Sequence, residues 1–443
     1  MKVNLVRTFL ATALSVVTAY AQSPDPSIAG KSKPVRYIVK DLGPFPGGTF
    51  SDVATISDNG LAAGRANGKE GASDSSWHAA LWLSGHNLPL DISTPGLGGR
   101  NSEAFGVNER GQAAGVAETN RLDPNGEDFC GFGAQGLPYN GHACLPFLWQ
   151  NGVMTALPTL GGANGAAGQI NKWGEVAGFV ETLNRDPDPA CPVHQFKPVV
   201  WANGIAQELT IPLNGDTEGA LYGINDNGQV VGASGTCMPF SVTGQTYLNP
   251  VHALLWERGG VTDLGNLPGQ TGSIAGAINN LGQVIGSSGL YGFLWSRATG
   301  MRPLLPLSSD FLSTPVAIND GGDVVVGLSI DGSFSVLSAV VWENGTSLPV
   351  NLNDRLIDNA GLYLQLAEGI NSRGEIVGFA QPINSPLETH GFVAIPVTRG
   401  ADDDSSRAEQ SVMRPAALSE YARRLLLERL RFGGFATRPV GPR

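Results

Sequence analysis

The stretch Ile224-Asn225-Asp226-Asn227-Gly228-Gln229-Val230-Val231-Gly232 contains the pattern that decides the fold. An Asn-x-x-Gly segment between two apolar runs is typical of a hairpin turn in which glycine supplies a positive φ. We therefore predict a strand before this Asn, called strand A, and an antiparallel partner after the Gly, called strand B. The Asn and Asp residues of such turns are explained by turn geometry alone.

The same pattern occurs seven times along the chain, and the turn glycines are 40 to 63 residues apart. Repetition at this period is typical of propellers and other repeat architectures. The residue before each Asn is Ile or Val, and the residues two and four positions earlier are mostly small, as a crowded inner strand requires. The turns occupy residues 57–60, 108–111, 171–174, 225–228, 279–282, 319–322 and 371–374.

A third apolar run, strand C, follows each B strand and ends in Trp in six of the seven copies. After Trp201, for example, Ala202-Asn203-Gly204 predicts another hairpin turn, and in the next copy a short fourth strand is expected at Val261–Leu264. Four antiparallel strands repeated seven times predict an all-β, seven-bladed β-propeller of four-stranded blades. The alternative is a division of the copies between two open sandwiches.

The two ends of the repeat region predict how the ring closes. Copy seven stops after its third strand, near Val397, whereas an additional strand at Arg36–Gly43 precedes copy one. We expect the N-terminal strand to complete the last blade, which would leave no unpaired sheet edge at the seam.

The chain divides into four segments. Residues 1–21 are predicted to be a secretory signal peptide, with a basic start, an apolar stretch and the cleavage site Ala19-Tyr20-Ala21. The apolar stretch is shorter than a membrane span, so no transmembrane segment is expected after cleavage following Ala21. Residues 22–35 form a linker, 36–398 the propeller, and 399–443 a polar linker with an amphipathic C-terminal helix. That helix either folds back on the propeller or docks on a partner or membrane surface.

Three motifs resemble those of the HAF family of probable extracellular repeat proteins over residues 36–398. They are the Ile-Asn-x-x-Gly-Gln-Val-Val-Gly phrase, the strand C phrase that begins at His78 or His252, and the Asp-Leu-Gly phrase. The resemblance implies an exported bacterial repeat protein, located outside the cell, in the periplasm or at the cell surface. It implies no catalytic residue, because the motif is structural. Lys197, Tyr291 and Ser338 replace the His in other copies, which argues against a required chemical role.

The connections between strands B and C are longest in copies two, three and four, and all four cysteines lie there. An even number of cysteines in an exported chain indicates disulfides. We favour Cys130–Cys144 within one loop and Cys191–Cys237 between neighbouring blades. The alternative is a mixed Cys/His zinc site that includes His142 or His194.

Polar residues in the same insertions are the candidate binding residues. They are Asp123, Asn125, Glu127, Asp128, Asp186 and Asp188. Their oxygens suit calcium, although their spacing does not match an EF-hand loop, and the alternative is that they are solvated turn residues. No catalytic residue, metal ligand or cofactor is assigned, since the sequence lacks a nucleophile elbow, a P-loop and a dinucleotide fingerprint.

Charge and composition narrow the function. Residues 36–398 carry 32 acidic and 15 basic side chains, so a nucleic acid partner is not expected. The sequence favours an exported, non-enzymatic scaffold that binds an extracellular glycan or protein through its inserted loops. The alternative is an exported carbohydrate-active or other hydrolytic enzyme with carboxylates at one mouth of the propeller. Ionisable side chains that meet in a pocket at the axis would favour the enzyme.

Overall fold

A computed structural model describes residues 34–68, 76–126, 129–132, 140–188, 193–211, 213, 215–240, 245–333 and 336–397, with only the backbone described for 238–240 and 245–251. The predicted signal peptide, almost all of the linker 22–35 and the predicted C-terminal tail from residue 399 lie outside these ranges, as do Glu127, Asp128 and Cys191. The chain divides at Val35, and the unit described below begins at Arg36. The described ranges contain no helix with the length and hydropathy that a bilayer crossing requires.

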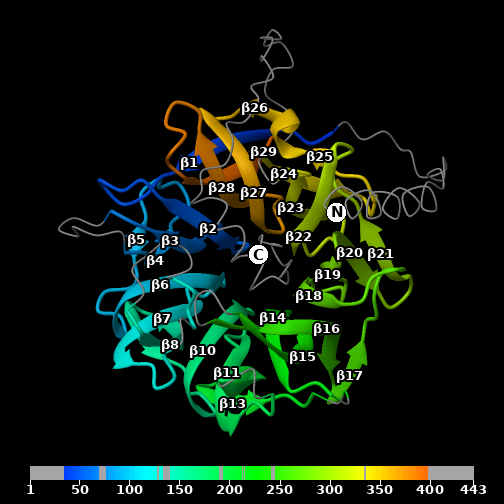
Figure 1. Cartoon of the computed structure of the whole chain (residues 1–443). Helices are drawn as coiled ribbons and strands as arrows, with labels where there is room; N and C mark the ends of the chain where they lie inside the picture. The colour runs from blue at the N-terminus through cyan, green and yellow to red at the C-terminus, as the bar shows by residue number, and fades with distance from the viewer. Residues whose placement is uncertain are drawn as a thin grey trace, which may run out of the picture. The chain divides into compact units, whose positions relative to one another are not determined.

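Seven sheets surround one axis, and each sheet is a blade (Figure 1). The first three blades have their four strands in chain order from the axis outward. Blade 1 contains β2 (Ser51–Ile56), β3 (Ala62–Ala66), β4 (His78–Trp82) and β5 (Leu90–Asp91). Blade 2 contains β6 (Gly98–Val107), β7 (Ala113–Leu122), β8 (His142–Gln150) and β9 (Val153–Ala156). Blade 3 contains β10 (Gly161–Ile170), β11 (Val176–Arg185), β12 (His194–Ala202) and β13 (Ile205–Glu208).

The next three blades repeat this order. Blade 4 contains β14 (Glu218–Ile224), β15 (Val230–Phe240), β16 (Gln245–Glu257) and β17 (Gly260–Asp263). Blade 5 contains β18 (Ser273–Ile278), β19 (Val284–Ser288), β20 (Tyr291–Ser296) and β21 (Gly300–Leu304). Blade 6 contains β22 (Asp310–Ile318), β23 (Val324–Asp331), β24 (Leu337–Glu343) and β25 (Val350–Asn351).

Blade 7 closes the ring with both ends of the repeat region. It contains β27 (Leu362–Ile370), β28 (Ile376–Pro382), β29 (His390–Pro396) and the N-terminal strand β1 (Tyr37–Leu42). β1 pairs antiparallel with β29, from Tyr37↔Pro396 to Leu42↔Gly391, and the two lie side by side in Figure 1 in blue and orange. The predicted seven-bladed propeller and its N-terminal closing strand are therefore confirmed, and the sandwich alternative is wrong.

Two elements of blade 7 were not predicted. A fifth strand, β26 (Leu356–Asp358), pairs with β1 in parallel on the outside of the blade. The short 3₁₀ segment η2 (Leu352–Arg355) precedes it and is the one helical element among the described residues. The sequence of β26 alternates too briefly to be distinguished from a loop, and only the presence of β1 gives it a partner.

The inner strands approach one another closely enough to explain their small residues. A Cβ added to Gly106 would lie 2.7 Å from the carbonyl oxygen of Gly168 in the next blade, and one on Gly223 would lie 3.0 Å from Ala277 Cα. Almost every inner strand also has a register shift across the residue three positions before the turn Asn. This bulge and the following Ile or Val line the space at the axis.

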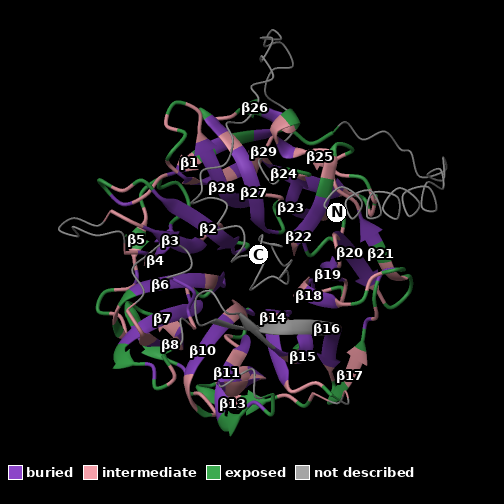
Figure 2. Ribbon diagram, in the orientation of Figure 1, coloured by how far each residue is buried: buried purple, intermediate pink, exposed green. Residues whose placement is uncertain are grey.

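The tryptophans that end strand C connect each blade to the one before it. Trp201 Nε1 donates to the Pro158 carbonyl at 2.9 Å, and Trp342 Nε1 donates to the Leu305 carbonyl at 3.0 Å. Both side chains are 1% exposed. Figure 2 shows that buried residues extend along the strands of all seven blades, with exposed residues mainly at the outer turns. The repeated Trp is therefore an inter-blade residue, which accounts for its recurrence.

Candidate functional site

The seven repeated turns meet around the axis at one end of the propeller, which we call the turn face. Each turn Asn uses its side-chain carbonyl to accept backbone N–H groups of its own turn, and in five of the six turn Asn residues the amide reaches the next blade, whereas Asn319 donates to Asp323 of its own turn. Asn225 Nδ2 donates to Gln229 Oε1 at 2.7 Å and to the Asn279 carbonyl at 2.9 Å. The expectation that turn geometry alone explains these residues is wrong, because they also join neighbouring blades.

This contact recurs around the ring. The donors to the next turn's carbonyl are Asn108, Asn171, Asn225, Asn279 and Asn371. The last of these closes the circle, since Asn371 Nδ2 donates to the Ser57 carbonyl of blade 1 at 3.1 Å. Copy one carries Ser57 in place of Asn. The hub is therefore a chain of side-chain-to-backbone hydrogen bonds that runs in one direction.

The residues that follow these turn positions form a polar rim. In blade order the rim residues are Asp58, Glu109, Lys172, Asp226, Asn280, Asp320 and Ser372. Several of them accept a backbone N–H from the preceding blade, as Asp226 Oδ1 does from Lys172 at 3.0 Å. Four carboxylates and one ammonium group therefore stand at this end of the axis.

A cavity of about 350 Å³ lies beneath the rim. Its wall contains an apolar ring formed by the Ile or Val before each turn, and every member is 6–9% exposed. The ring consists of Ile56, Val107, Ile170, Ile224, Ile278, Ile318 and Ile370. The bulge residues form a second level, where Phe105, Tyr222, Val316 and Glu368 alternate with smaller residues. A volume in this range is at the small end of known ligand pockets.

A buried charged cluster borders the same cavity on blades 1 and 2. Arg65 donates to Glu103 Oε2 at 2.7 Å and lies 3.6 Å from Asp52 Oδ2. The guanidinium carbon is also 4.1 Å from the ring centroid of Trp77, a cation–π contact. Arg65, Glu103 and Glu368 all line the cavity. Ionisable groups thus do meet at the axis.

Sequence reasoning missed this cluster, although a signal was present. Glu368 stands at an inner-strand position where the other copies carry Ala, Gly, Val, Phe or Tyr. Glu103 stands at one where the other copies carry Ala, Ile, Leu or Thr, apart from Asp52 in copy one, and Arg65 follows the Gly that ends the B-strand phrase. A charged residue at a position that is uncharged in most other copies is the pattern that distinguishes the cluster from the repeat.

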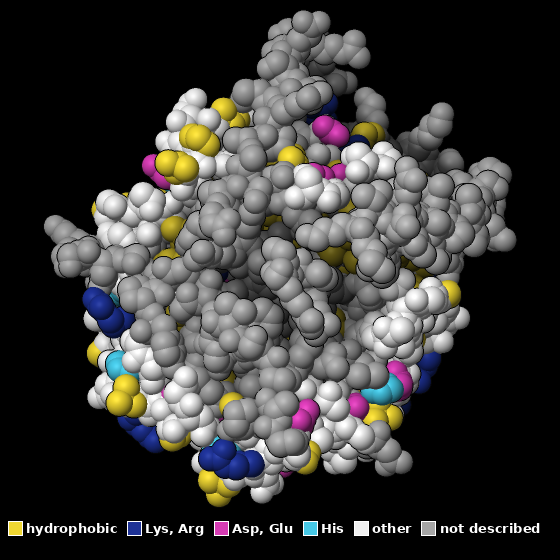
Figure 3. Space-filling view, viewed as in Figure 1, with side chains coloured by type: hydrophobic (Ala, Val, Ile, Leu, Met, Phe, Trp, Pro, Cys, Tyr) yellow, Lys and Arg dark blue, Asp and Glu magenta, His cyan; other side chains and the backbone are white. Residues whose placement is uncertain are grey.

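The opposite end of the propeller, which carries the connections between strands B and C, is called the loop face. The insertions of blades 2, 3 and 4 fold there as extensions of the B–C hairpins. β15 and β16 have 11 and 13 residues, whereas β19 and β20 of blade 5 have 5 and 6. In Figure 3, described side chains of both charge signs are scattered around the edge of the face in view, without one dominant patch.

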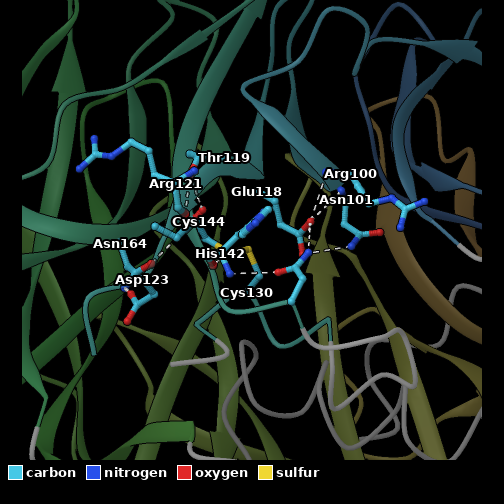
Figure 4. Close-up of a disulfide and its surroundings, with 12 residues drawn as sticks. Arg100, Asn101, Glu118, Thr119, Arg121, Asp123, Cys130, His142, Cys144 and Asn164 are labelled. Atoms are coloured by element: carbon cyan, nitrogen blue, oxygen red, sulfur yellow. Dashed lines mark hydrogen bonds between the residues drawn. A yellow bond between two sulfur atoms is a disulfide. The ribbon is translucent and has the colours of Figure 1, made fainter. Parts of the chain in front are cut away.

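The insertion of blade 2 is held by a disulfide between Cys130 and Cys144, as predicted (Figure 4). Phe132 from this insertion makes an edge contact with Trp77, with ring centroids 6.3 Å apart. These residues belong to one apolar cluster that also includes residues of blades 1, 3, 6 and 7. Several members line the cavity as well, among them Leu366, so this cluster forms the loop-face end of the axial cavity.

The remaining cysteine prediction is tested in part. Cys237 is disulfide-bonded and packs against Val193, while its predicted partner Cys191 lies outside the described residues. Cys144 does not serve as a metal ligand, because its sulfur is in the disulfide. Among the described residues no group of three or more His, Cys, Asp or Glu side chains is arranged to hold a metal ion.

Asp123 joins blade 2 to blade 3 instead of facing solvent. It is 7% exposed and accepts from Asn164 Nδ2, which also donates to Glu181 Oε2 at 3.2 Å. The pKa of Glu181 is raised to about 7, because burial and the nearby Asp123 raise it by more than the hydrogen bonds from Asn164 and Ala163 lower it. Asn125 donates its backbone N–H to Asp123 Oδ1 at 2.7 Å and closes the turn.

Asp186 occupies the equivalent place between blades 3 and 4. It is 9% exposed, and its Oδ1 accepts from the backbone N–H of Asp188, which is itself exposed. The partner across the interface is Glu218, which is 0% exposed. Burial, together with the hydrogen bond to Asp186, raises the pKa of Glu218 to about 10. The insertions of blades 2 and 3 thus each place one carboxyl pair at a blade interface.

The candidate binding residues therefore do not gather at one place. Asp123 and Asp186 lie at two successive interfaces, Asn125 and Asp188 form the adjoining turns, and Glu127 and Asp128 lie outside the described residues. The solvated alternative is wrong for both buried aspartates, because each is enclosed at a blade interface.

The His of strand C has a structural partner in three blades. His252 Nδ1 lies 2.9 Å from Asp263 Oδ2, and His390 Nδ1 lies 2.9 Å from Asp41 Oδ2. His78 and Asp91 form the third pair at 3.3 Å. These contacts link strand C to the outermost strand, which explains why the His and Asp-Leu-Gly phrases occur together.

The fold and the axial site define a seven-bladed β-propeller with a central cavity. No family model matches the sequence, and no curated protein matches it either. Solved structures with some similarity include a gluconolactonase from Xanthomonas campestris, 9% identical over 68% of this chain and 93% of that one, with a TM-score of 0.33. Another is a puromycin-hydrolysing peptidase from Mycobacterium tuberculosis, 12% identical over 75% of this chain and 58% of that one, with a TM-score of 0.28. Similarity at this level gives no information about the activity of this chain.

Proposed function

We propose that this chain is an exported, non-enzymatic scaffold of the HAF type, which binds an extracellular glycan or protein at its loop face. The observation that carries the proposal is the extension of three neighbouring B–C hairpins beyond the length that the propeller needs. Blade 5 completes the same hairpin with a two-residue connection, Gly289-Leu290, between β19 and β20. Blade 4 continues β15 and β16 to the pair Phe240↔Gln245.

The construction of these hairpins supports a surface of fixed shape. The Cys130–Cys144 disulfide and the buried carboxyl pairs hold the insertions against neighbouring blades, which reduces the entropy that binding would cost. Disulfides persist in oxidising compartments, and this supports export together with the signal-peptide pattern of residues 1–21. The excess of acidic side chains in residues 36–398 supports a partner other than nucleic acid.

The test is a glycan and protein binding screen on the mature chain and on a variant with a shortened hairpin. Deletion of residues 236–249 would reduce the blade 4 connection to the length seen in blade 5, with Cys191→Ser to avoid an odd thiol. The matched control is Cys191→Ser with Cys237→Ser in the full-length hairpin. We expect ligands that bind the control to lose at least tenfold in affinity for the shortened chain. Equal binding to both would contradict a loop-face site on blade 4.

One observation favours the hydrolytic alternative. Arg65, Glu103 and Glu368 reach the axial cavity, and carboxylates in a pocket are the groups that general acid–base catalysis uses. Glu368 is the residue to test, because it lines the cavity from the inner strand of blade 7 and is 3% exposed. An activity screen with ester, lactone and glycoside substrates, repeated on Glu368→Gln, examines this alternative. A hydrolysis rate that falls at least a hundredfold in the variant would support the enzyme and contradict the non-enzymatic proposal.

A further inference from the structure

The axial cavity has an acidic entrance and, directly beneath it, an apolar ring, while Arg65, Glu103 and Glu368 line it as well. Seven Ile and Val side chains form the ring beneath the turn face, each largely buried yet in contact with the cavity. Above them the rim holds Asp58, Glu109, Asp226 and Asp320 against one basic residue, Lys172. Asp58, Glu109 and Asp320 are exposed although they also line the cavity, so the cavity reaches the surface at this end.

The rim already accommodates one ammonium group of the chain itself. Lys172 Nζ lies 3.2 Å from Asp226 Oδ2 and 4.9 Å from the ring centroid of Trp173. Trp173 is 62% exposed, and its indole N–H donates to the Asp226 carbonyl, which holds the ring beside the rim. A carboxylate next to an aromatic face is the arrangement that recognises ammonium ligands.

The other three acidic residues of the rim lie on the remaining arc, on blades 6, 1 and 2. They act as hydrogen-bond acceptors for backbone or amide groups: Asp58 from Ser372, Glu109 from Asp58, and Asp320 from Asn280. The nearest arginines lie one residue further along the turns and have partners of their own, Arg110 at the Trp173 carbonyl and Arg373 at Glu375. The charge of this arc therefore remains negative.

We propose that the axial cavity binds a small amphipathic organic cation, a primary or quaternary amine on an apolar body. The ammonium group lies at the carboxylate rim on the arc of blades 6, 1 and 2, and the apolar body fills the ring of Ile and Val side chains. An inorganic ion is not the occupant, because no three carboxylates among the described residues converge to chelate one. This site is at the turn face and is independent of the loop-face function proposed above.

The ligand class is tested with three probes of one shape and different charge: 4-phenylbutylamine, 4-phenylbutanol and 4-phenylbutyrate. Binding to the full chain is measured by titration calorimetry at low and high salt. We expect one amine per chain, bound about tenfold more tightly than the alcohol, with the carboxylate weakest. High salt should reduce the preference for the amine, since exposed charges are screened.

The location is tested by filling the cavity. Gly276 lines it at the bulge of blade 5, and the one atom near an added Cβ is the Ile285 carbonyl oxygen at 3.9 Å. Blades 2 and 4 carry Phe105 and Tyr222 at this position, so the backbone accepts a large side chain there. Gly276→Phe should abolish binding of the amine and the alcohol. Gly260→Phe, at an exposed site in β17, is the control and should bind as the unmodified chain does.

The charge requirement is tested on the rim itself. A triple variant with Asp58→Asn, Glu109→Gln and Asp320→Asn keeps the acceptor oxygens but removes three charges. It should lose the preference for the amine and bind the alcohol unchanged. The control removes three exposed carboxylates elsewhere, with Glu208→Gln, Asp354→Asn and Asp358→Asn, and should keep the preference for the amine.

Each outcome of these experiments supports or overturns a different part of the proposal. Loss of amine and alcohol binding in Gly276→Phe, and loss of only the preference for the amine in the rim variant, with both controls intact, support the proposal. Equal affinity for amine and alcohol in the unmodified chain overturns the cation preference, and binding that survives Gly276→Phe overturns the axial location. Failure of all three probes to bind overturns the site itself. None of these results bears on ligands of the loop face, which the hairpin deletion tests.

Discussion

The turn face and the loop face are built on different principles. At the turn face six of the seven copies contribute an Asn-x-x-Gly turn, with Ser57 in place of Asn in copy one, and the Asn contact between blades occurs five times around the ring. At the loop face blades 2, 3 and 4 each carry a long hairpin, whereas blade 5 carries the shortest. The insertions are stabilised by a disulfide and by carboxyl pairs, which the short hairpin of blade 5 does not contain.

The two faces therefore contain residues with different roles. The repeated residues hold the blades together, and the residues that depart from the repeat are particular to this chain. The repeated residues Asn, Gly and Trp all contact a neighbouring blade, so their recurrence reflects assembly. Residues that depart from the repeat, such as Arg65, Glu181 and Glu218, lie buried toward the loop face or beside the cavity. Four experiments test the contrast, from the largest expected effect to the smallest.

The first experiment removes a buried tryptophan between blades. Trp342→Ala should cost about 3–5 kcal/mol, because it leaves a cavity and an unsatisfied Leu305 carbonyl. The matched control is Trp173→Ala at the exposed turn, expected to cost less than about 1 kcal/mol. Chemical unfolding measures both, and a similar loss in the two variants would contradict the assembly role of the strand C tryptophan.

The second experiment opens the blade 2 insertion. Replacing both Cys130 and Cys144 with Ser releases a loop whose ends are 14 residues apart and should cost about 3 kcal/mol in the chain-entropy treatment. Unfolding in urea gives the change, and protease sensitivity within the insertion reports where it occurs. Unchanged stability would mean that the apolar cluster around Phe132 alone holds the insertion.

The third experiment breaks one link of the turn-face hub. Asn225→Ala removes the hydrogen bonds to Gln229 and to the Asn279 carbonyl and should cost about 2 kcal/mol. Ser57→Asn is the complementary change, since blade 1 is the copy without Asn, and we expect it to stabilise the ring by about 1 kcal/mol. A destabilising effect of Ser57→Asn would show that blade 1 needs the smaller side chain.

The fourth experiment is expected to stabilise the protein by replacing a buried ionisable residue. The pKa of Glu218 is raised to about 10 by burial and by Asp186, so the native state binds this proton more tightly than the unfolded chain does. That contribution is fully present at low pH and is lost as pH rises from about 4.5 toward 10. Glu218→Gln cannot ionise and should raise the melting temperature at pH 8 by about 2 °C, with a smaller effect at pH 4. Glu208→Gln, at an exposed position, is the control and should change little at either pH.

Much of the fold was predictable because the same pattern of strands and turns occurs seven times in the sequence. The turn glycines locate the first hairpin of every blade, and the lone strand before copy one predicts the β1–β29 seam, which the register confirms. β26 escaped prediction since its three residues form a strand only beside β1, and that pairing joins segments more than 300 residues apart.

The site was less predictable for a physical reason. Asp123 and Asp186 were selected as acidic turn residues, and a sequence does not show that a neighbouring blade will bury them against Glu181 and Glu218. The cavity at the axis likewise depends on seven separate strands, each of which contributes one or two side chains. The Cys130–Cys144 pair was accessible to sequence reasoning because both cysteines belong to one loop.

The direction of the Asn contacts has a consequence for how such a chain can diversify. Five of the six turn Asn amides bind a main-chain carbonyl of the following blade, a group that every amino acid provides. The residue that accepts this hydrogen bond can therefore change without loss of the contact. A copy can be duplicated, exchanged or recombined without a matching substitution in the adjacent blade. For the same reason, new termini placed between any two blades should be tolerated as well as the natural ones, which makes the order of modules, and not only their residues, available to engineering.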